Sequence, residues 1–149
     1  MSRTVYALSL RQPWAALVVH GVKTIEIRRW PTEHRGVVLI HASRQSDPRP
    51  DGWELVPVEA QATATLHGGI IGIVELTGCV SYDRPEAFAA DGPRHRNHPD
   101  WFRPPRLYGF VLERPRLLPF RSLPGQVRFF SVPLTPREWK RLKPRRAKG

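Results

Sequence analysis

The 149-residue chain contains one cysteine, Cys79, so it lacks the partner for an internal disulfide and the thiols for a cysteine-built zinc site. No apolar run approaches the roughly 18–20 residues of a membrane-spanning helix, and the N-terminus shows no signal-peptide pattern. These absences favour a cytoplasmic protein in a reducing compartment without a membrane partner. The length predicts one domain that buries its own core.

Several catalytic signatures are also missing. The sequence contains no Walker-type glycine loop, no G-x-G-x-x-G and no G-x-S-x-G elbow. Cys79 lies within an apolar stretch, which is typical of an inert core thiol rather than of a nucleophile. His95 and His98, with Asp100 nearby, form the one spacing that resembles a metal site, and it is weak. We therefore expect no metal and no cofactor.

Acidic residues are scarce beside the basic ones. The chain has 13 Asp and Glu against 24 Lys and Arg, a formal net charge of +11, and only four of the basic residues are lysine. Residues 1–46 carry seven basic groups against two acids, and residues 115–149 carry ten against one. Arginine suits phosphate and base edges, so the charge favours nucleic acid as a partner. The alternative is a solvated surface of an arginine-rich protein.

The apolar pattern predicts short strands and two short helices. A helix over about 14–20 is bounded by Pro13 and by Gly21, and Thr135 with Glu138 forms a capping box that starts a second helix. Two long connections, 44–66 and 83–106, separate the strands, and the second has a short helical stretch at 85–90. The predicted strands cover residues 5–10, 24–30, 37–43, 69–82, 107–113 and 126–132. This order favours a mostly β member of the α+β class: a small barrel of five to six strands with a short helix at each end.

Two sequence blocks carry a family resemblance. Ser9–Trp14, followed by Gly21–Arg28 with its G-x-K-x-x-E-x-R pattern, resembles the ASCH domain of the PUA-like superfamily. Gly69–Leu76 and Gly125–Phe130 are similar to later strands of that family. The resemblance covers residues 5–134 and implies a PUA-like β-barrel, a cleft between the first helix and the barrel, and RNA or nucleotide-type ligands. We expect residues 1–134 to form this domain and residues 135–149 to add a short helix and a basic tail.

The same blocks contain the candidate site residues. Lys23 follows the glycine that ends the first helix, where its ammonium could reach a phosphate or a carbonyl oxygen. Glu26 and Arg28 share a strand face, so Glu26 could accept from a base amine or hold its basic neighbours. Glu75 is the single charge in an apolar strand: it either faces water at the strand edge or needs a cationic partner, for which Lys23 and Arg28 are candidates. We expect Lys23, Glu26 and Glu75 to share one cleft, as catalytic groups if the protein is an enzyme.

Aromatic and basic side chains extend this cleft. Trp14, Trp30 and Trp101 are candidate stacking surfaces for a base, although Trp14 also fits the helix core. His41 and Arg44 lie at the end of the predicted strand 37–43 and could line the mouth of the cleft. The predicted nucleic-acid-binding set is Arg11, Trp14, Lys23, Glu26, Arg28, Arg29, Trp30, His41 and Arg44.

Three functions remain open at this point. The first is a binding module for RNA, with single-stranded DNA as a second ligand, a modified nucleoside as a third and no obligate protein partner. The second is implied by the resemblance, because a branch of the family hydrolyses acylated cytidine-type nucleosides with a lysine, a threonine and a glutamate. Glu26 occupies the position of that threonine, and Thr24 is offset by two residues, which weakens this function. The third is a ribonuclease in which Lys23 stabilises phosphate charge and Glu26 or Glu75 acts as base.

Overall fold

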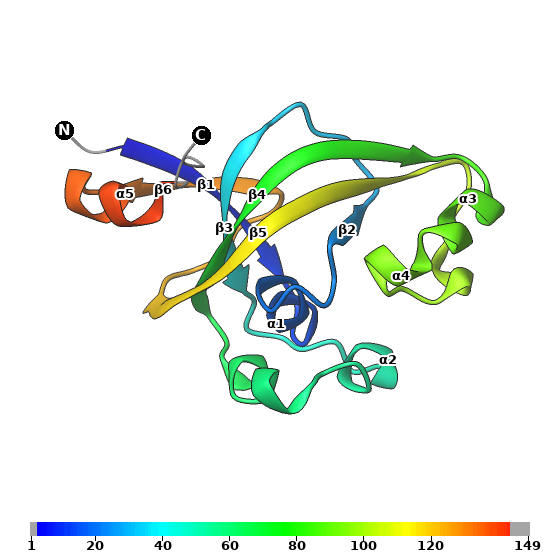
Figure 1. Ribbon diagram of the computed structural model, residues 1–149, viewed down its shortest axis with the longest axis horizontal. Coiled ribbons are helices and arrows are strands. Elements are labelled where there is room, and N and C mark those ends of the chain that lie inside the picture. Colours follow the sequence, from blue (N-terminus) through cyan, green and yellow to red (C-terminus); the bar gives the residue numbers. More distant parts are fainter. Residues whose placement is uncertain (1–2, 144–149) are drawn as a thin grey trace, which may run out of the picture.

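A computed structural model describes residues 3–143, which form one curved six-stranded sheet with short helices on its concave side and at its ends (Figure 1). The expected α+β, mostly β class is confirmed. The strands are β1 (Arg3–Leu10), β2 (Ile25–Arg28), β3 (Gly36–Ala42), β4 (Gly69–Tyr82), β5 (Leu107–Ser122) and β6 (Phe129–Leu134). The helices are α1 (Trp14–Val19), α2 (Pro50–Trp53), α3 (Pro85–Ala90), α4 (Gly92–His95) and α5 (Pro136–Leu142), with 3-10 turns η1 (Val58–Ala60), η2 (Thr63–Thr65) and η3 (Pro99–Trp101).

The sheet has the order β2-β5-β4-β3-β1-β6. The β1–β3 pair is parallel and the other pairs are antiparallel. Within residues 3–143, the edge strands β2 and β6 do not pair, so the closed barrel expected from the sequence is not confirmed. The two edges approach through aromatic side chains instead: Trp30 packs edge-on against Phe129 at 5.5 Å, and Phe129 stacks on Phe110 at 5.9 Å. Aromatic contacts, rather than a hydrogen-bonded ladder, therefore join these two edges in residues 3–143.

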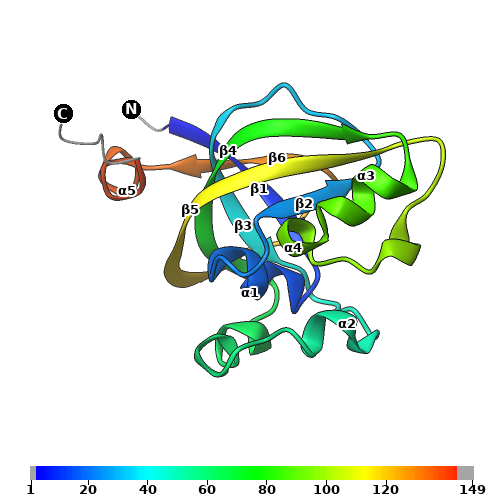
Figure 2. The same ribbon diagram turned by 45° about the vertical axis from the view of Figure 1, so that its right-hand side comes forward.

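Helix α1 is the centre of the main core. All six of its residues are buried, and it packs against β3, β4 and β5 (Figure 2). Gly21, as expected, ends the helical segment in a left-handed conformation, with φ of 76°. Gly72 of β4 permits the helix to lie close to the sheet, because a Cβ there would overlap Val19 Cγ1.

Smaller clusters fix the two ends of the sheet. Helix α5 begins with the predicted capping box of Thr135 and Glu138, and its Trp139 and Leu142 pack beside β1 and β6. At the opposite end, α3 covers β4 and β5 through Phe88, and α4 packs beside β2 (Figure 1). The part of the basic tail that falls on residues 144–149 lies outside the described residues.

Two strand boundaries differ from expectation. Strand β5 continues through Pro115 and Pro119 to Ser122, nine residues beyond the predicted end. A bulge absorbs the first proline, since Arg114 has a φ of 50° and the β4–β5 register shifts beside it. Strand β6 begins at Phe129 rather than at 126, because Arg128 is left-handed, with a φ of 59°. Residues 126–128 are therefore free to act as a loop.

The long connection 44–66 contains the helix α2 and the two 3-10 turns η1 and η2. Buried Gln12 anchors it: the side-chain amide donates to the carbonyls of Thr63 and Leu66 at 2.9 Å each, while its oxygen accepts from the N–H of Ala16. The start of α1 and this connection are thus one packed unit. No helix in residues 3–143 is long and apolar enough to cross a membrane.

The close approach at Gly72 gives a test of the fold. Gly72→Ala forces a methyl group into Val19 and the carbonyl of Arg116, so it should lower the free energy of unfolding by about 1–3 kcal/mol. Gly78→Ala, in the same strand, meets only Val111 at ordinary van der Waals distance, and should leave stability unchanged or slightly raised. Urea denaturation measures both. Equal stability of the two variants would contradict the packing of α1 on β4.

Candidate functional site

One cleft brings together four of the nine predicted binding residues: Arg11, Trp14, Glu26 and Arg28. It has a volume of about 450 Å³ and opens between the end of β1, strand β2 and the segments 43–49, 97–101 and 126–128. Four arginines and two tryptophans line it, together with polar side chains from every one of these segments. The lining includes Arg11, Trp14, Glu26, Arg28, Asp47, Arg49, Asn97, Trp101, Gln126 and Arg128.

Strand alternation produces the central ion pair of the cleft. Glu26 and Arg28 lie two residues apart on β2 and share its inner face, as predicted. Arg28 donates from one terminal nitrogen to Glu26 Oε2 at 2.9 Å and to the carbonyl of Ser9 at 3.1 Å. The Nε of Arg28 is covered and has no hydrogen-bond partner among residues 3–143. Arg28 therefore holds β2 against β1 and keeps unused donor capacity beside the cleft.

Lys23 lies behind this pair rather than in the cleft. Its side chain is 1% exposed, and it is not among the cleft-lining residues. The ammonium donates to the carbonyl of His95 and to Asn97 Oδ1 at 2.7 Å, and lies 3.7 Å from Glu26 Oε1. Burial lowers the pKa of Lys23 to about 8, although the carboxylate of Glu26 opposes the shift. The ammonium thus makes two hydrogen bonds and one longer ionic contact, and through them Lys23 holds the wall of the cleft together.

The segment that follows α4 supplies the other side of this wall. His95 is fully buried; its Nδ1 accepts from the N–H of Asn97 at 3.0 Å, and its Nε2 faces the carbonyl of Phe88 at 2.7 Å. Nε2 must therefore carry the proton of a neutral imidazole. Burial lowers the pKa of His95, which agrees with this neutral form. His95 is a structural residue that orients Asn97, not a metal ligand.

Asp47 and Arg49 form a second ion pair at the opposite rim. Asp47 accepts from the indole N–H of Trp14 at 2.9 Å and from Arg49 Nε and a terminal nitrogen at 3.0 and 2.9 Å. The Arg49 guanidinium also lies over the Trp101 ring, 3.9 Å from its centroid. Burial alone would raise the pKa of Asp47, but the hydrogen bonds from Arg49 and Trp14 lower it to about 2. At neutral pH this carboxylate is ionised, and both of its oxygens accept hydrogen bonds.

The remaining predicted residues separate into three places. Arg11 and Trp14 line the cleft. Arg29 and Trp30 line an adjoining hollow that shares Arg28, Arg49 and Trp101 with it. The Trp30 ring is packed by Phe110 and Phe129 and lies under the Arg128 guanidinium, 5.1 Å away. Its best stacking face is therefore already in contact with a cation.

His41 and Arg44 do not line the cleft. His41 is 1% exposed, and its ring bridges the hydroxyl of Ser9 at 2.9 Å and the carbonyl of Leu123 at 2.7 Å. It ties β1 and β3 to the chain just before the 126–128 segment. Arg44 is exposed and packs beside Gly68. The expected cleft-lining role does not match either position.

Glu75 corrects the expected constellation. Leu76, its neighbour on β4, belongs to the core around α1, so Glu75 points to the opposite face of the sheet. There it pairs with Arg114 at 2.9 Å and lines a separate hollow with Val37 and Leu142. Its partner is neither Lys23 nor Arg28. The structure thus brings Lys23 and Glu26 together but leaves Glu75 outside their cleft.

Sequence reasoning missed Asp47, Arg49, Asn97 and Arg128. The first three lie in connections whose spatial position depends on interactions far along the chain, and no local motif marks them. The aromatic residue Trp101 was a candidate stacking surface, and its place in the cleft wall agrees with that interpretation. Residues 3–143 contain no group of three or more potential metal ligands.

Comparisons with known proteins agree with this geometry. The family model described as the ASCH domain matches residues 8–114. Activating signal cointegrator 1 of Mus musculus is 37% identical over 89 residues, and its Homo sapiens counterpart is 36% identical over the same length. Each alignment covers 51% of this chain and 14% of the relative, so the chain spans about a seventh of the length of these curated relatives.

Solved structures of low sequence identity share the fold. The crystal structure of ASCH from Zymomonas mobilis has a TM-score of 0.61 and 20% identity, and the match covers 92% of each chain. A point mutant of that protein has a TM-score of 0.62 and 21% identity, covering 94% of this chain and 96% of the other. At this identity the likeness concerns the fold alone.

The low pKa of Asp47 predicts an acid-dependent contribution to stability. A carboxylate whose pKa falls on folding stabilises the protein above its unfolded pKa of 3.8, and this contribution is lost as the pH falls towards 2. Asp47→Asn should therefore lose about 1–2 kcal/mol of unfolding free energy at pH 6 and much less near pH 2. Asp83→Asn, at an exposed position, is the control. Parallel pH profiles for the two variants in urea denaturation would contradict this account.

Lys23 predicts the reverse dependence at alkaline pH. A lysine whose pKa falls on folding carries a charge penalty below pH 8, and the penalty disappears as the pH rises from about 8 to 10.5. The stability of the native protein relative to Lys23→Met should thus increase over this interval, by up to ~3 kcal/mol. Lys140→Met, at an exposed position, corrects for other titrating groups. A flat difference would show that Lys23 is not buried as a charge.

Proposed function

The chain belongs to the ASCH domain family, and from this premise we propose that its cleft binds single-stranded RNA. The family is generally linked to RNA binding. The observation that supports the proposal most directly is the composition of the cleft, where four arginines surround a base-sized hollow with tryptophans in its wall. Unpaired bases held on aromatic and arginine planes, with phosphates on basic groups, are the usual design for recognition of single-stranded RNA.

The arginines divide into two groups. Arg28 and Arg49 are partly neutralised by Glu26 and Asp47, so they shape the cleft. The side chains of Arg11 and Arg128 form no ion pair among residues 3–143 and lie on the cleft lining. We assign the phosphate contacts to these two rim arginines. Arg29 and Arg103 line the adjoining hollow and extend the basic surface along which a strand could continue.

The rest of the chain has a supporting role in this proposal. Residues 1–134 contain the cleft, and residues 135–149, with Lys143, Arg145, Arg146 and Lys148 near the end, add affinity that does not depend on sequence and is sensitive to salt. Single-stranded DNA is the second ligand, since the rim contacts would not require a 2′-hydroxyl. We place the activity in the cytoplasm, without a cofactor.

The hydrolase alternatives receive less support from the geometry. Lys23 is buried, donates to His95 and Asn97 and does not line the cleft, and Glu75 lies on the opposite face of the sheet. The amidohydrolase would need both groups beside a substrate, and the ribonuclease would need Lys23 there. Glu26 alone remains available, and it is held between two cations.

The proposal predicts a salt-dependent weakening of binding in a cleft variant. Arg11→Ala combined with Arg128→Ala should weaken binding of an eight-nucleotide single-stranded RNA about tenfold or more at 0.1 M salt. The slope of log affinity against log salt should become shallower by about 0.7 for each phosphate group that is no longer neutralised. Fluorescence anisotropy over a salt series measures both quantities.

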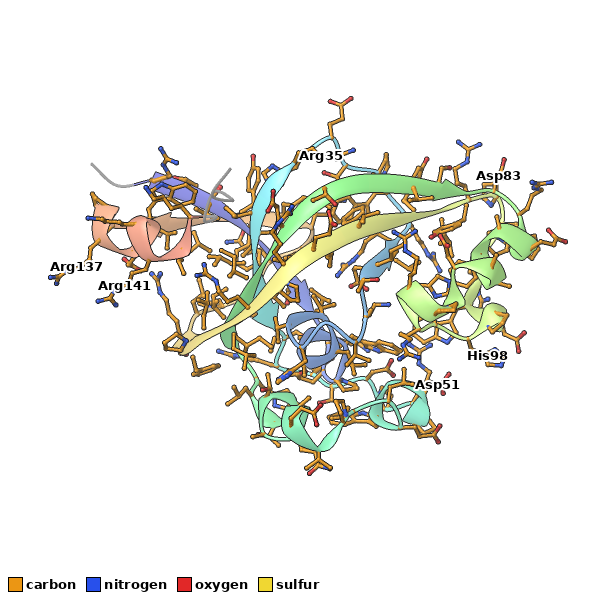
Figure 3. All side chains as sticks on the ribbon, in the orientation of Figure 1. Arg35, Asp51, Asp83, His98, Arg137 and Arg141 are labelled. Atoms are coloured by element: carbon orange, nitrogen blue, oxygen red, sulfur yellow. The ribbon has the colours of Figure 1, made fainter. Side chains whose placement is uncertain are left out.

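The control carries the same change in charge away from the cleft. Arg35 and Arg137 project from the periphery of the molecule (Figure 3), and Arg35→Ala combined with Arg137→Ala should retain most of the affinity. If this control weakens binding as much as the cleft variant does, the basic surface binds RNA without the cleft and the proposed site is wrong.

A further inference from the structure

Asn97 has a buried side-chain amide whose oxygen is already hydrogen-bonded. The residue is 6% exposed, and its Oδ1 lies 2.7 Å from the Lys23 ammonium. A lysine ammonium can only donate, so the oxygen of the amide must face Lys23 and the NH₂ group must face away from it. The backbone N–H of Asn97 is fixed as well, by donation to His95 Nδ1 at 3.0 Å. The orientation of the side chain is thus determined from both ends.

The NH₂ group of Asn97 has no hydrogen-bond partner among residues 3–143. Within this part of the chain, Arg28 Nε is the one side-chain polar atom that is both covered and unpartnered, so the Asn97 nitrogen keeps access to open space. That space is the cleft, since Asn97 is part of its lining. A nearly buried donor, held in one orientation and directed into a cavity, is costly to leave unpaired and indicates a ligand acceptor.

Glu26 provides an acceptor next to this donor. Its side chain is 11% exposed and lines the cleft. Both Asn97 Oδ1 and Glu26 Oε1 lie within 4 Å of the same Lys23 nitrogen, so the two side chains are neighbours. Oε1 faces Lys23 and the N–H of Ile27, whereas Oε2 accepts from Arg28 alone. One lone pair on Oε2 therefore remains for a ligand donor.

We propose that Asn97 and Glu26 together read the edge of an unpaired nucleobase, Asn97 donating to a ring nitrogen or carbonyl and Glu26 accepting from an adjacent N–H. Lys23 is the positioning residue that fixes Asn97 for this role. The inference rests on the proposed RNA-binding function and adds the part of the ligand that enters the cleft. A donor beside an acceptor is the pattern that a base edge completes.

Asn97 and Glu26 form the floor of the cleft, and the charge of this floor decides which part of a nucleotide enters the cleft. A phosphate carries no N–H donor and would meet the carboxylate of Glu26, so it is excluded from the floor. The rim arginines Arg11 and Arg128 provide the opposite environment. A nucleotide thus orients with its base inward and its phosphates outward, and the aromatic edges of Trp14 and Trp101 flank the base.

The test compares RNA octamers that differ only in their bases. Octamers of cytidine, adenosine and uridine, and an octamer of abasic ribose, carry the same phosphates. The native protein should bind at least one base-containing octamer about tenfold more tightly than the abasic one. Asn97→Asp keeps an oxygen for Lys23 but replaces the N–H with a second acceptor, so it should remove this preference.

A charge control separates base reading from electrostatics. Gln126→Glu adds the same negative charge to the cleft lining without altering its floor, and should weaken all octamers equally while the base preference remains. Free cytidine, adenosine and uridine are titrated in parallel. A nucleoside that binds as tightly as its octamer supports base reading and identifies a nucleoside, rather than a strand, as the ligand.

A spectroscopic readout on the native protein makes the result independent of how the variant folds. The side-chain amide resonances of Asn97 should shift with the preferred octamer and stay in place with the abasic one. Equal affinity for base-containing and abasic octamers, or an unchanged preference in Asn97→Asp, would overturn the base-reading inference while RNA binding stands. Failure of every octamer and nucleoside to bind would overturn the proposed function itself, and this inference with it.

Discussion

The buried ammonium of Lys23 connects the parts of the molecule on which the cleft depends. It follows the glycine that ends α1, and it contacts Glu26 on β2 and the carbonyl of His95 after α4. A buried ammonium needs nearby acceptors, because the desolvation cost of its charge is several kcal/mol. The groups around it lie up to 74 residues from Lys23 along the chain, so pairing one ammonium fixes the relative positions of the first helix, the edge strand and the 83–106 connection.

The local features of the fold could be predicted from the sequence because each depends on neighbouring residues. Pro13 and Gly21 bound α1, the capping box starts α5, and alternation places Glu26 and Arg28 on one face of β2. Strand β5 could not be predicted in full, since Pro115 normally ends a strand and is accommodated here only by a bulge against β4. Closure of the sheet could not be predicted either. It depends on whether the edge strands β2 and β6 meet through hydrogen bonds or through aromatic side chains such as Trp30.

In the candidate site, too, contacts between residues close in sequence could be predicted and contacts between distant residues could not. Lys23 and Glu26 are three residues apart, so a sequence motif records their contact. Asp47 and Asn97 reach the cleft from two long connections, and the pairing of Asp47 with Trp14 spans 33 residues. Glu75 illustrates the opposite error. A lone carboxylate in an apolar strand suggests a buried functional group, but Glu75 lies on the face of β4 away from α1, where it pairs with Arg114. Only the register of the neighbouring strands tells which face a residue occupies.

The excess of arginine has different meanings in different parts of the molecule. Arg114 and Arg121 pair with acids on the surface, where each ion pair contributes little to stability. Arg28 and Arg49 are bound to carboxylates in the cleft wall, so their donors shape the site and their net charge is largely cancelled. Among the described residues of the cleft lining, only Arg11 and Arg128 bring uncompensated charge. The net charge of +11 therefore overstates the positive potential at the site, and specificity must come from the neutral and acidic groups of the floor. A basic rim around such a floor attracts any polyanion, but it retains best a ligand that can turn an N–H edge towards Glu26 and an acceptor towards Asn97.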